Sequence, residues 1–245
     1  MILNVKRKTL IGIVGLGKSG TTLLCNIINS ADNAFCLCEP HWSLMLSPLS
    51  LRLDKVSSKL NIKTEKDVML EVKKLLYKDE TFDVAGIKET WAIERKKPFE
   101  YMTKGNPDFY IFLFRDPKET LNGYWKEKSA IKIDEFINEY IEYCEMYKKY
   151  YRKSNVCSVF LKDLCFFHND YIGLIKYLNN RLKNNLCIFN DFSLKTTNYI
   201  FGSKKANENN EIFPYNDDQS LLSFEEKKHI DTKLSNVYEK TINFN

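Results

Sequence analysis

The sequence has no long apolar run and no apolar segment behind its charged N-terminus, and each absence excludes a class of protein. No hydrophobic stretch approaches the roughly 20 residues that a membrane-spanning helix needs. The opening stretch, MILNVKRKTL, carries charges, but no apolar segment of the kind found in secretory signals follows them. We therefore expect a cytoplasmic protein without a transmembrane segment.

A large excess of charge of either sign is also lacking. Lys and Arg number 37 against 32 for Asp and Glu, which gives a net charge of +5 over 245 residues. This excess is too small and too dispersed for a nucleic-acid groove, although it favours an anionic small molecule as ligand. We expect no nucleic-acid partner. A chain of this length can bury the core of one domain, residues 1–245.

Clusters of metal ligands are scarce too. The only grouping that resembles one is Cys36, Cys38 and His41, and no second pair of Cys or His supplies the remaining ligands of a zinc site. The seven cysteines are an odd number, and most of them fall inside apolar stretches. We therefore predict buried, reduced thiols, with neither a metal site nor a disulfide framework.

What the sequence does contain is an alternation of short apolar runs and helix-like stretches. Strands are predicted at 10–14, 34–38, 82–88, 109–114 and 156–161. Helices are predicted at 20–30, after Thr64, from 89 toward Pro98, and at 133–153. This alternation is typical of an α/β fold, a doubly wound parallel sheet with helices on both faces. Such sheets bind ligands at the carboxyl ends of their strands.

Local signals mark two further helix starts. Pro117 follows a strand that exits in Arg-Asp, and proline suits the first turn of a helix. Ser223 and Glu226 form a capping box for a last helix. From about residue 181 to residue 245 the chain is less regular, and residues 202–211 are predicted to form a mobile loop.

One stretch, LIGIVGLGKSGTTLL at residues 10–24, fits three phosphate-binding patterns. Residues 12–19 fit the nucleotide-triphosphate loop GxxxxGK[ST], and residues 15–20 fit the dinucleotide fingerprint GxGxxG. Residues 18–22, KSGTT, resemble the phosphosulfate loop of sulfotransferases. All three patterns place a phosphate at a helix N-terminus, where free N–H groups and the helix dipole favour an anion.

The first two patterns have specific requirements elsewhere in the chain. A triphosphate loop beginning at Gly12 leaves only a short apolar strand that ends at Ile11, preceded by VKRK. A dinucleotide site finds its ribose-binding acid in Glu39 but requires neither Lys18 nor the two threonines after Gly20. A kinase that uses Mg·ATP and a non-catalytic nucleotide-binding protein both stay open as alternatives.

The third pattern is accompanied by further segments. GLGKSGTTLL, FLFRDPKETLNGYW, VFLKDL and LLSFEEKKHI follow one another along the chain. In this order they resemble the motifs of sulfotransferases that use 3′-phosphoadenosine 5′-phosphosulfate (PAPS). The resemblance implies a P-loop-type fold and a transferase that moves the sulfuryl group of PAPS to a hydroxyl of a small-molecule or glycan acceptor. It implies no metal.

The resemblance also implies a set of cofactor-binding residues. Arg115 would hold the 3′-phosphate, and Gly123, eight residues later, stands where the family has a serine that shares this phosphate. A serine at position 123 would therefore be expected to tighten binding. Lys204 would contribute from a late loop. The residues implied for the 5′-phosphate are Gly17, Lys18, Ser19, Gly20, Thr21 and Thr22.

Four residues are candidates for the chemistry. Lys18 would stabilise the leaving phosphate, and Lys88 would neutralise the transferring sulfonate. Glu39, 21 residues after Lys18 and at the end of what we expect to be the adjacent strand, is the candidate base. This placement resembles tyrosylprotein and bacterial carbohydrate sulfotransferases. His41 is the rival base, because other sulfotransferases use a histidine. They carry it in a Lys-Thr-His sequence that reads Lys88-Glu89-Thr90 here, so Glu39 is the first choice.

Overall fold

The computed structural model describes residues 8–31, 33–39, 71, 74, 81–91, 107–151, 155–167, 170–182 and 220–243. Several sequence expectations lie outside these ranges. They are the helix capped by Thr64, the continuation of the chain from residue 92 toward Pro98, the loop at 202–211, His41 and Lys204.

Five parallel strands form one sheet, which confirms the predicted α/β architecture. Their order is β2-β3-β1-β4-β5, so β1 is the central strand. The strands are β1 Thr9–Leu16, β2 Ala34–Cys38, β3 Val84–Trp91, β4 Phe109–Phe114 and β5 Val156–Phe160.

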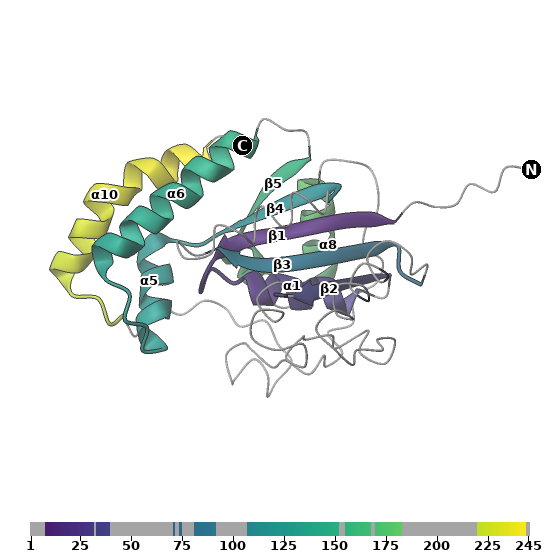
Figure 1. The fold of residues 1–245 in the computed structure, drawn as a ribbon, viewed down its shortest axis with the longest axis horizontal. Coiled ribbons are helices and arrows are strands. Elements are labelled where there is room, and N and C mark those ends of the chain that lie inside the picture. Colours follow the sequence, from purple (N-terminus) through teal and green to yellow (C-terminus); the bar gives the residue numbers. More distant parts are fainter. Residues whose placement is uncertain are drawn as a thin grey trace, which may run out of the picture.

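Helices cover both faces of this sheet, as Figure 1 shows. One face packs against α1 (Thr21–Ser30), α7 (Leu161–Phe166) and α8 (Tyr171–Arg181). The other packs against α6 (Ile133–Tyr151), and α10 (Phe224–Ile242) packs on α6 and on α5 (Pro117–Lys126), which also contacts α6. Strands covered on both faces have to be apolar throughout, and all six residues of β4 are buried.

Two tyrosines of α6 form hydrogen bonds with backbone carbonyl groups near the ends of β1 and β4. The Tyr143 hydroxyl contacts the carbonyl oxygens of Val14 and Leu113 at 3.1 and 3.0 Å, and the Tyr140 hydroxyl donates to the Arg115 carbonyl at 2.7 Å. Burial raises the pKa of both phenols well above the usual range, so they stay protonated donors. These bonds fasten α6 to the edge of the sheet where a ligand would bind.

The predicted helix starts after β4 and before α10 are confirmed. Pro117 opens α5, and the Asp116 carboxylate caps it by accepting from the N–H groups of Lys118 and Glu119 at 2.9 and 3.2 Å. In α10 both bonds of the Ser223–Glu226 capping box are present.

The predicted carboxyl-terminal ends of three strands are wrong, and β3 also begins at Val84, two residues later than predicted. β1 continues past Val14 to Leu16, and β3 continues past Lys88 to Trp91, because these extensions pair with each other in register. Residues 89–91 are therefore strand and not the start of a helix. β5 ends at Phe160, one residue early, because α7 begins at Leu161.

The predicted neighbour of β1 is also wrong. β3 lies between β1 and β2 and pairs with both, so Glu39 does not follow a strand adjacent to β1. Within the described part of the chain, no helix is both long and apolar enough to cross a membrane.

Candidate functional site

The loop between β1 and α1 is shaped by two residues with left-handed backbone. Lys18 has φ of 63° and Gly20 has φ of 97°. Glycine is suited to this conformation, and a Cβ at position 20 would also lie 2.6 Å from the Leu161 side chain. The N–H and the hydroxyl of Ser19 both donate to the Leu16 carbonyl, at 3.2 and 2.7 Å. Both donors of Ser19 therefore bond within the loop in this structure.

The N-terminus of α1 has the features of an anion site. Gly20 provides no side-chain cap, and the first turn carries no acidic residue. Leu24 makes the first hydrogen bond of the helix, to the Gly20 carbonyl at 3.1 Å. Within the described residues, the N–H groups of Thr21, Thr22 and Leu23 have no partner. Such N–H groups, together with the helix dipole, favour a phosphate.

Lys18 projects from this loop to the surface. Its side chain is 32% exposed, and its ammonium forms an ion pair with the carboxylate of Glu127, the residue that ends α5. The cation that the sequence predicts to bind the cofactor is therefore paired with a carboxylate in this structure. Glu127 was missed by sequence reasoning, because it lies 109 positions away from Lys18 and belongs to no motif.

Helix α5 packs directly against the loop, and glycines make the approach possible. A Cβ on Gly123 would lie 2.9 Å from the Lys18 Cβ and 3.4 Å from an Arg115 nitrogen. A Cβ on Gly17 would lie 2.3 Å from the Tyr124 hydroxyl. Gly123 thus stands beside Lys18 and Arg115. Its lack of a side chain is what lets helix and loop touch.

Arg115, at the end of β4, braces the same loop. One guanidinium nitrogen donates to the Lys18 carbonyl at 2.8 Å, and Nε pairs with Glu119 at 3.3 Å. Asn122, the residue before Gly123, is buried and accepts at Oδ1 from the Leu221 N–H at 2.8 Å. Asn122 therefore anchors the segment that leads into α10.

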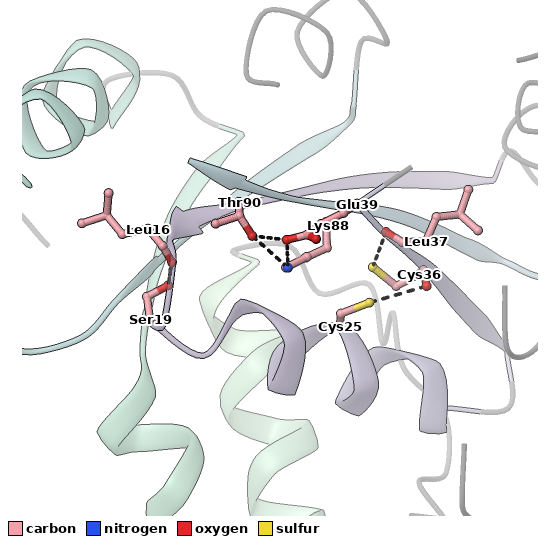
Figure 2. A network of polar contacts seen from close by, with 8 residues as sticks. All are labelled: Leu16, Ser19, Cys25, Cys36, Leu37, Glu39, Lys88 and Thr90. Carbon is pink, nitrogen blue, oxygen red and sulfur yellow. Dashed lines mark hydrogen bonds and ion pairs between the residues drawn. The ribbon is translucent and has the colours of Figure 1, made fainter. Parts of the chain in front are cut away.

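A second group of polar side chains lies at the ends of β2 and β3 (Figure 2). Lys88 Nζ contacts Glu39 Oε1 at 2.6 Å and donates to Thr90 Oγ1 at 3.0 Å. The Thr90 hydroxyl donates to the same Glu39 oxygen. Figure 2 shows these three side chains pointing toward one another on the α1 side of the sheet. Thr90 was not expected as a member of this group.

Lys88 is a buried cation, since only 2% of its side chain is exposed. Burial opposes the charged form, whereas the Glu39 carboxylate and its hydrogen bond favour it, and the pKa of Lys88 lies above its ordinary value. The side chain is therefore an ammonium at neutral pH. Its partner Glu39 is 23% exposed, so the pair reaches the surface through the carboxylate.

The backbone at Glu39 is unusual for its residue type. Its φ is 51°, in the left-handed region that residues with a Cβ rarely adopt. Its N–H donates to the Lys88 carbonyl at 2.6 Å, which holds the chain in this turn as it leaves β2. Strained conformations of this kind persist where surrounding contacts determine them.

Thiols line the sheet next to this group. Cys25, Cys36 and Cys38 are buried and free, and Asn29 ties α1 to β2 by bonding the N–H and carbonyl of Cys36 at 2.7 and 2.9 Å. The pKa of Cys25 is raised, chiefly by the Cys36 contact and by burial, which keeps the thiol protonated. Among the described residues, no group of His, Cys, Asp or Glu could hold a metal ion.

The predicted site residues that the structure describes, which leave out His41 and Lys204, therefore fall into two groups at the carboxyl edge of the sheet. Lys18 pairs with Glu127, whereas Glu39 pairs with Lys88. β3 links the groups, because Thr90 pairs in register with Gly15 just before the loop. The loop group contains Gly17, Lys18, Ser19, Gly20, Thr21, Thr22, Arg115 and Gly123.

The strand pattern weighs against the two other loop patterns. Gly12 lies in the middle of β1, paired with Ile87 and Tyr110, and so cannot open a triphosphate loop. In a dinucleotide fold of the usual strand order, the second strand lies next to the first. Here β3 occupies that position, so Glu39 is one strand too far away for the ribose-binding role.

The fold is shared with known enzyme structures. No protein-family model matches the sequence, and no curated protein matches it. The chain is similar to the crystal structure of a sulfotransferase from Alicyclobacillus acidocaldarius, with a TM-score of 0.55 and 12% identity over 97% of this chain and 95% of that one. A structure of mouse sulfotransferase SULT7A1 complexed with PAP is also similar, with a TM-score of 0.43 and 15% identity over 74% of this chain and 59% of that one. The protein has the P-loop-type α/β fold of the bacterial structure.

Proposed function

We propose that the protein is a PAPS-dependent sulfotransferase that transfers the sulfuryl group to an acceptor hydroxyl. The observation that carries the proposal is the loop group. An uncapped helix N-terminus, Lys18 and Arg115 lie together at the end of the central strand. This arrangement fits an anion with two phosphates. The fold is one on which a bacterial sulfotransferase is built, and the motif order along the chain also supports the proposal.

In this proposal the two phosphates of the cofactor bind on either side of Lys18. The N–H groups of Thr21 and Thr22 hold the 5′-phosphate, and Arg115 binds the 3′-phosphate with the planar fork that suits phosphate. Gly17 and Gly123 provide the close approach of loop and helix, and Gly123 supplies no hydroxyl. Lys204 stays a proposed contributor from the region outside the described residues.

The chemistry requires one bond to form and one to break at sulfur. The acceptor oxygen attacks sulfur as the bond from sulfur to the bridging oxygen of the 5′-phosphate breaks, and adenosine 3′,5′-bisphosphate leaves. Glu39 takes the hydroxyl proton, and Lys18 stabilises the charge that grows on the leaving oxygen. Lys88 holds Glu39 in place, as the 2.6 Å contact supports. His41 stays the rival base.

We further propose a carbohydrate or other glycan-type acceptor. The support is the glutamate at the end of β2, because a base in this place resembles the bacterial carbohydrate and tyrosylprotein sulfotransferases. Thr90 occupies the place of the histidine base of the other subclass. A transfer assay that compares sugar alcohols, glycans, phenols and tyrosine peptides checks this choice.

Calorimetric titration with adenosine 3′,5′-bisphosphate, with and without Mg²⁺, tests the proposed cofactor. We expect binding that does not depend on the metal and that weakens in an Arg115→Lys variant, because lysine cannot make a bidentate contact. Preference for Mg·ATP would instead identify a kinase. Tight binding of the bisphosphate without turnover on a broad acceptor panel would identify a non-catalytic member of the fold.

A further inference from the structure

We propose that Thr90 is a positioning residue that orients the Glu39 carboxylate for proton transfer. The inference rests on the proposed function, in which Glu39 is the base. It extends that function to a side chain that stands where other sulfotransferases carry a histidine. The argument begins with the direction of the hydrogen bonds around Thr90.

The hydroxyl of Thr90 has one defined orientation. The Lys88 ammonium can only donate, so Thr90 Oγ1 accepts from it at 3.0 Å. The single hydroxyl hydrogen is then directed to Glu39 Oε1. Oε1 thus accepts hydrogen bonds from both Thr90 and Lys88. Two bonds from different directions fix the orientation of the carboxylate better than one bond does.

Lys88 by itself would orient the carboxylate poorly. An ammonium is a rotatable point charge on a long flexible stem, whereas threonine is short and branched at Cβ, which restricts its χ1 angle. Thr90 is also rooted in the sheet, since it pairs with Gly15 of β1. Its hydroxyl therefore has a fixed position relative to the loop that begins after Leu16.

The position of Glu39 creates the need for such a contact. Glu39 is the first residue after β2, and its left-handed φ of 51° takes it out of the regular alternation of a strand. Its side-chain direction is therefore not set by the sheet. The N–H bond to the Lys88 carbonyl holds its backbone, and the contacts with Lys88 and Thr90 hold its carboxylate.

A pair of substitutions separates positioning from packing. Thr90→Val keeps the branched shape and suits a strand but removes the hydroxyl, and Thr90→Ser keeps the hydroxyl. We expect Thr90→Val to lower kcat by about 10- to 100-fold, as is typical of residues that orient an active group, with the KM for PAPS unchanged. The acid limb of the pH profile of kcat should move to higher pH, because a donor to the ionised carboxylate is lost. Thr90→Ser should restore both.

A variant without the base shows whether Thr90 acts through Glu39. In a Glu39→Gln background, Thr90→Val should cause no further loss, because the group that it orients no longer accepts the proton. An equal loss in both backgrounds would show that Thr90 acts independently of Glu39 and would overturn the proposal. Wild-type kcat and an unmoved pH profile in Thr90→Val would also overturn it.

A readout without turnover separates failure of this inference from failure of the proposed function. Absence of bisphosphate binding and of sulfuryl transfer in the wild type would refute the function. The carboxyl carbon signal of Glu39, assigned by its loss in Glu39→Gln, then decides on Thr90. We expect it to titrate at higher pH in Thr90→Val than in the wild type or Thr90→Ser. Identical titrations in all three would refute the positioning role.

Discussion

At the scale of single residues, the two lysines of the site differ in what surrounds them. Lys88 is buried and held by Glu39 and Thr90, whereas Lys18 is partly exposed and meets Glu127. A buried ion pair stays in place because separating it leaves a charge without compensation. An exposed pair contributes little and exchanges readily with another anion. Lys18 is therefore the cation that a ligand can recruit.

Replacing Glu127 tests this exchange. Glu127→Gln removes the carboxylate that competes for Lys18, and we expect adenosine 3′,5′-bisphosphate to bind about two- to fivefold more tightly, as fits an exposed ion pair. The difference from the wild type, measured by calorimetry, should shrink at high salt. Glu135→Gln, at an exposed position on α6, serves as the control for loss of one negative charge. Equal affinities in all three proteins would contradict a competing role.

Replacing Glu39 separates its chemistry from its charge pairing. Glu39→Gln keeps an oxygen that can accept from Lys88 and Thr90 but cannot take a proton. We expect kcat to fall by ~10²–10⁴ with bisphosphate affinity unchanged. Because Lys88 is buried, the unfolding free energy is measured in parallel. Near-normal turnover would assign the base elsewhere, and a His41→Ala variant with a large loss would place it at His41.

At the scale of elements, the contact between α5 and the phosphate loop depends on the absence of side chains. Gly17 lies under Tyr124, and Gly123 lies against Lys18. Arg115 adds the third contact, from the end of β4 to the Lys18 carbonyl. Helix, loop and strand end are therefore in direct contact, and we expect a change in one of them to shift the position of Lys18.

The packing around position 123 predicts that a serine there has the opposite effect from the one that the motif alone suggests. Its Cβ would lie 2.9 Å from the Lys18 Cβ, so helix and loop would have to separate. We expect Gly123→Ser to weaken bisphosphate binding and to lower the unfolding free energy by about 1–3 kcal/mol, the usual cost of overpacking. Lys126→Ser, exposed on the same helix, controls for the new hydroxyl. Tighter binding would show that the helix yields and that the serine contacts the phosphate.

At the scale of the whole molecule, α6 connects the far face of the sheet to the edge that carries the site. Tyr143 bonds carbonyl groups of both β1 and β4, whose ends lead to the loop and to Arg115. These carbonyls are buried, and a buried carbonyl without a donor costs free energy.

Tyr143→Phe removes the bonding hydroxyl with little change of shape. We expect the unfolding free energy to fall by about 1–3 kcal/mol, because Val14 and Leu113 lose a donor in the core. Chemical denaturation measures this loss, and an unchanged m-value shows that the same surface is exposed on unfolding. Unaltered stability would mean that water or another group replaces the phenol.

Much of the fold was predictable from the sequence because the signals are local. The apolar runs at 34–38 and 109–114 match β2 and β4, Pro117 opens α5, and the Ser223 capping box opens α10. Each signal depends on residues within a few positions of one another. The loop between β1 and α1 was predictable for the same reason, since its pattern lies within one turn between a strand and a helix.

Only the tertiary structure decided the order of the strands and the partners of the charges. Nothing local shows that β3 separates β1 from β2, because strand pairing joins residues dozens of positions apart. The same holds for Lys18, whose partner is Glu127, and for Thr90, whose hydroxyl bonds Glu39 at the end of the neighbouring strand. The sequence alone determined which side chains are available for the chemistry. Their partners follow from non-local packing, which brings charged groups together wherever the strands and helices end.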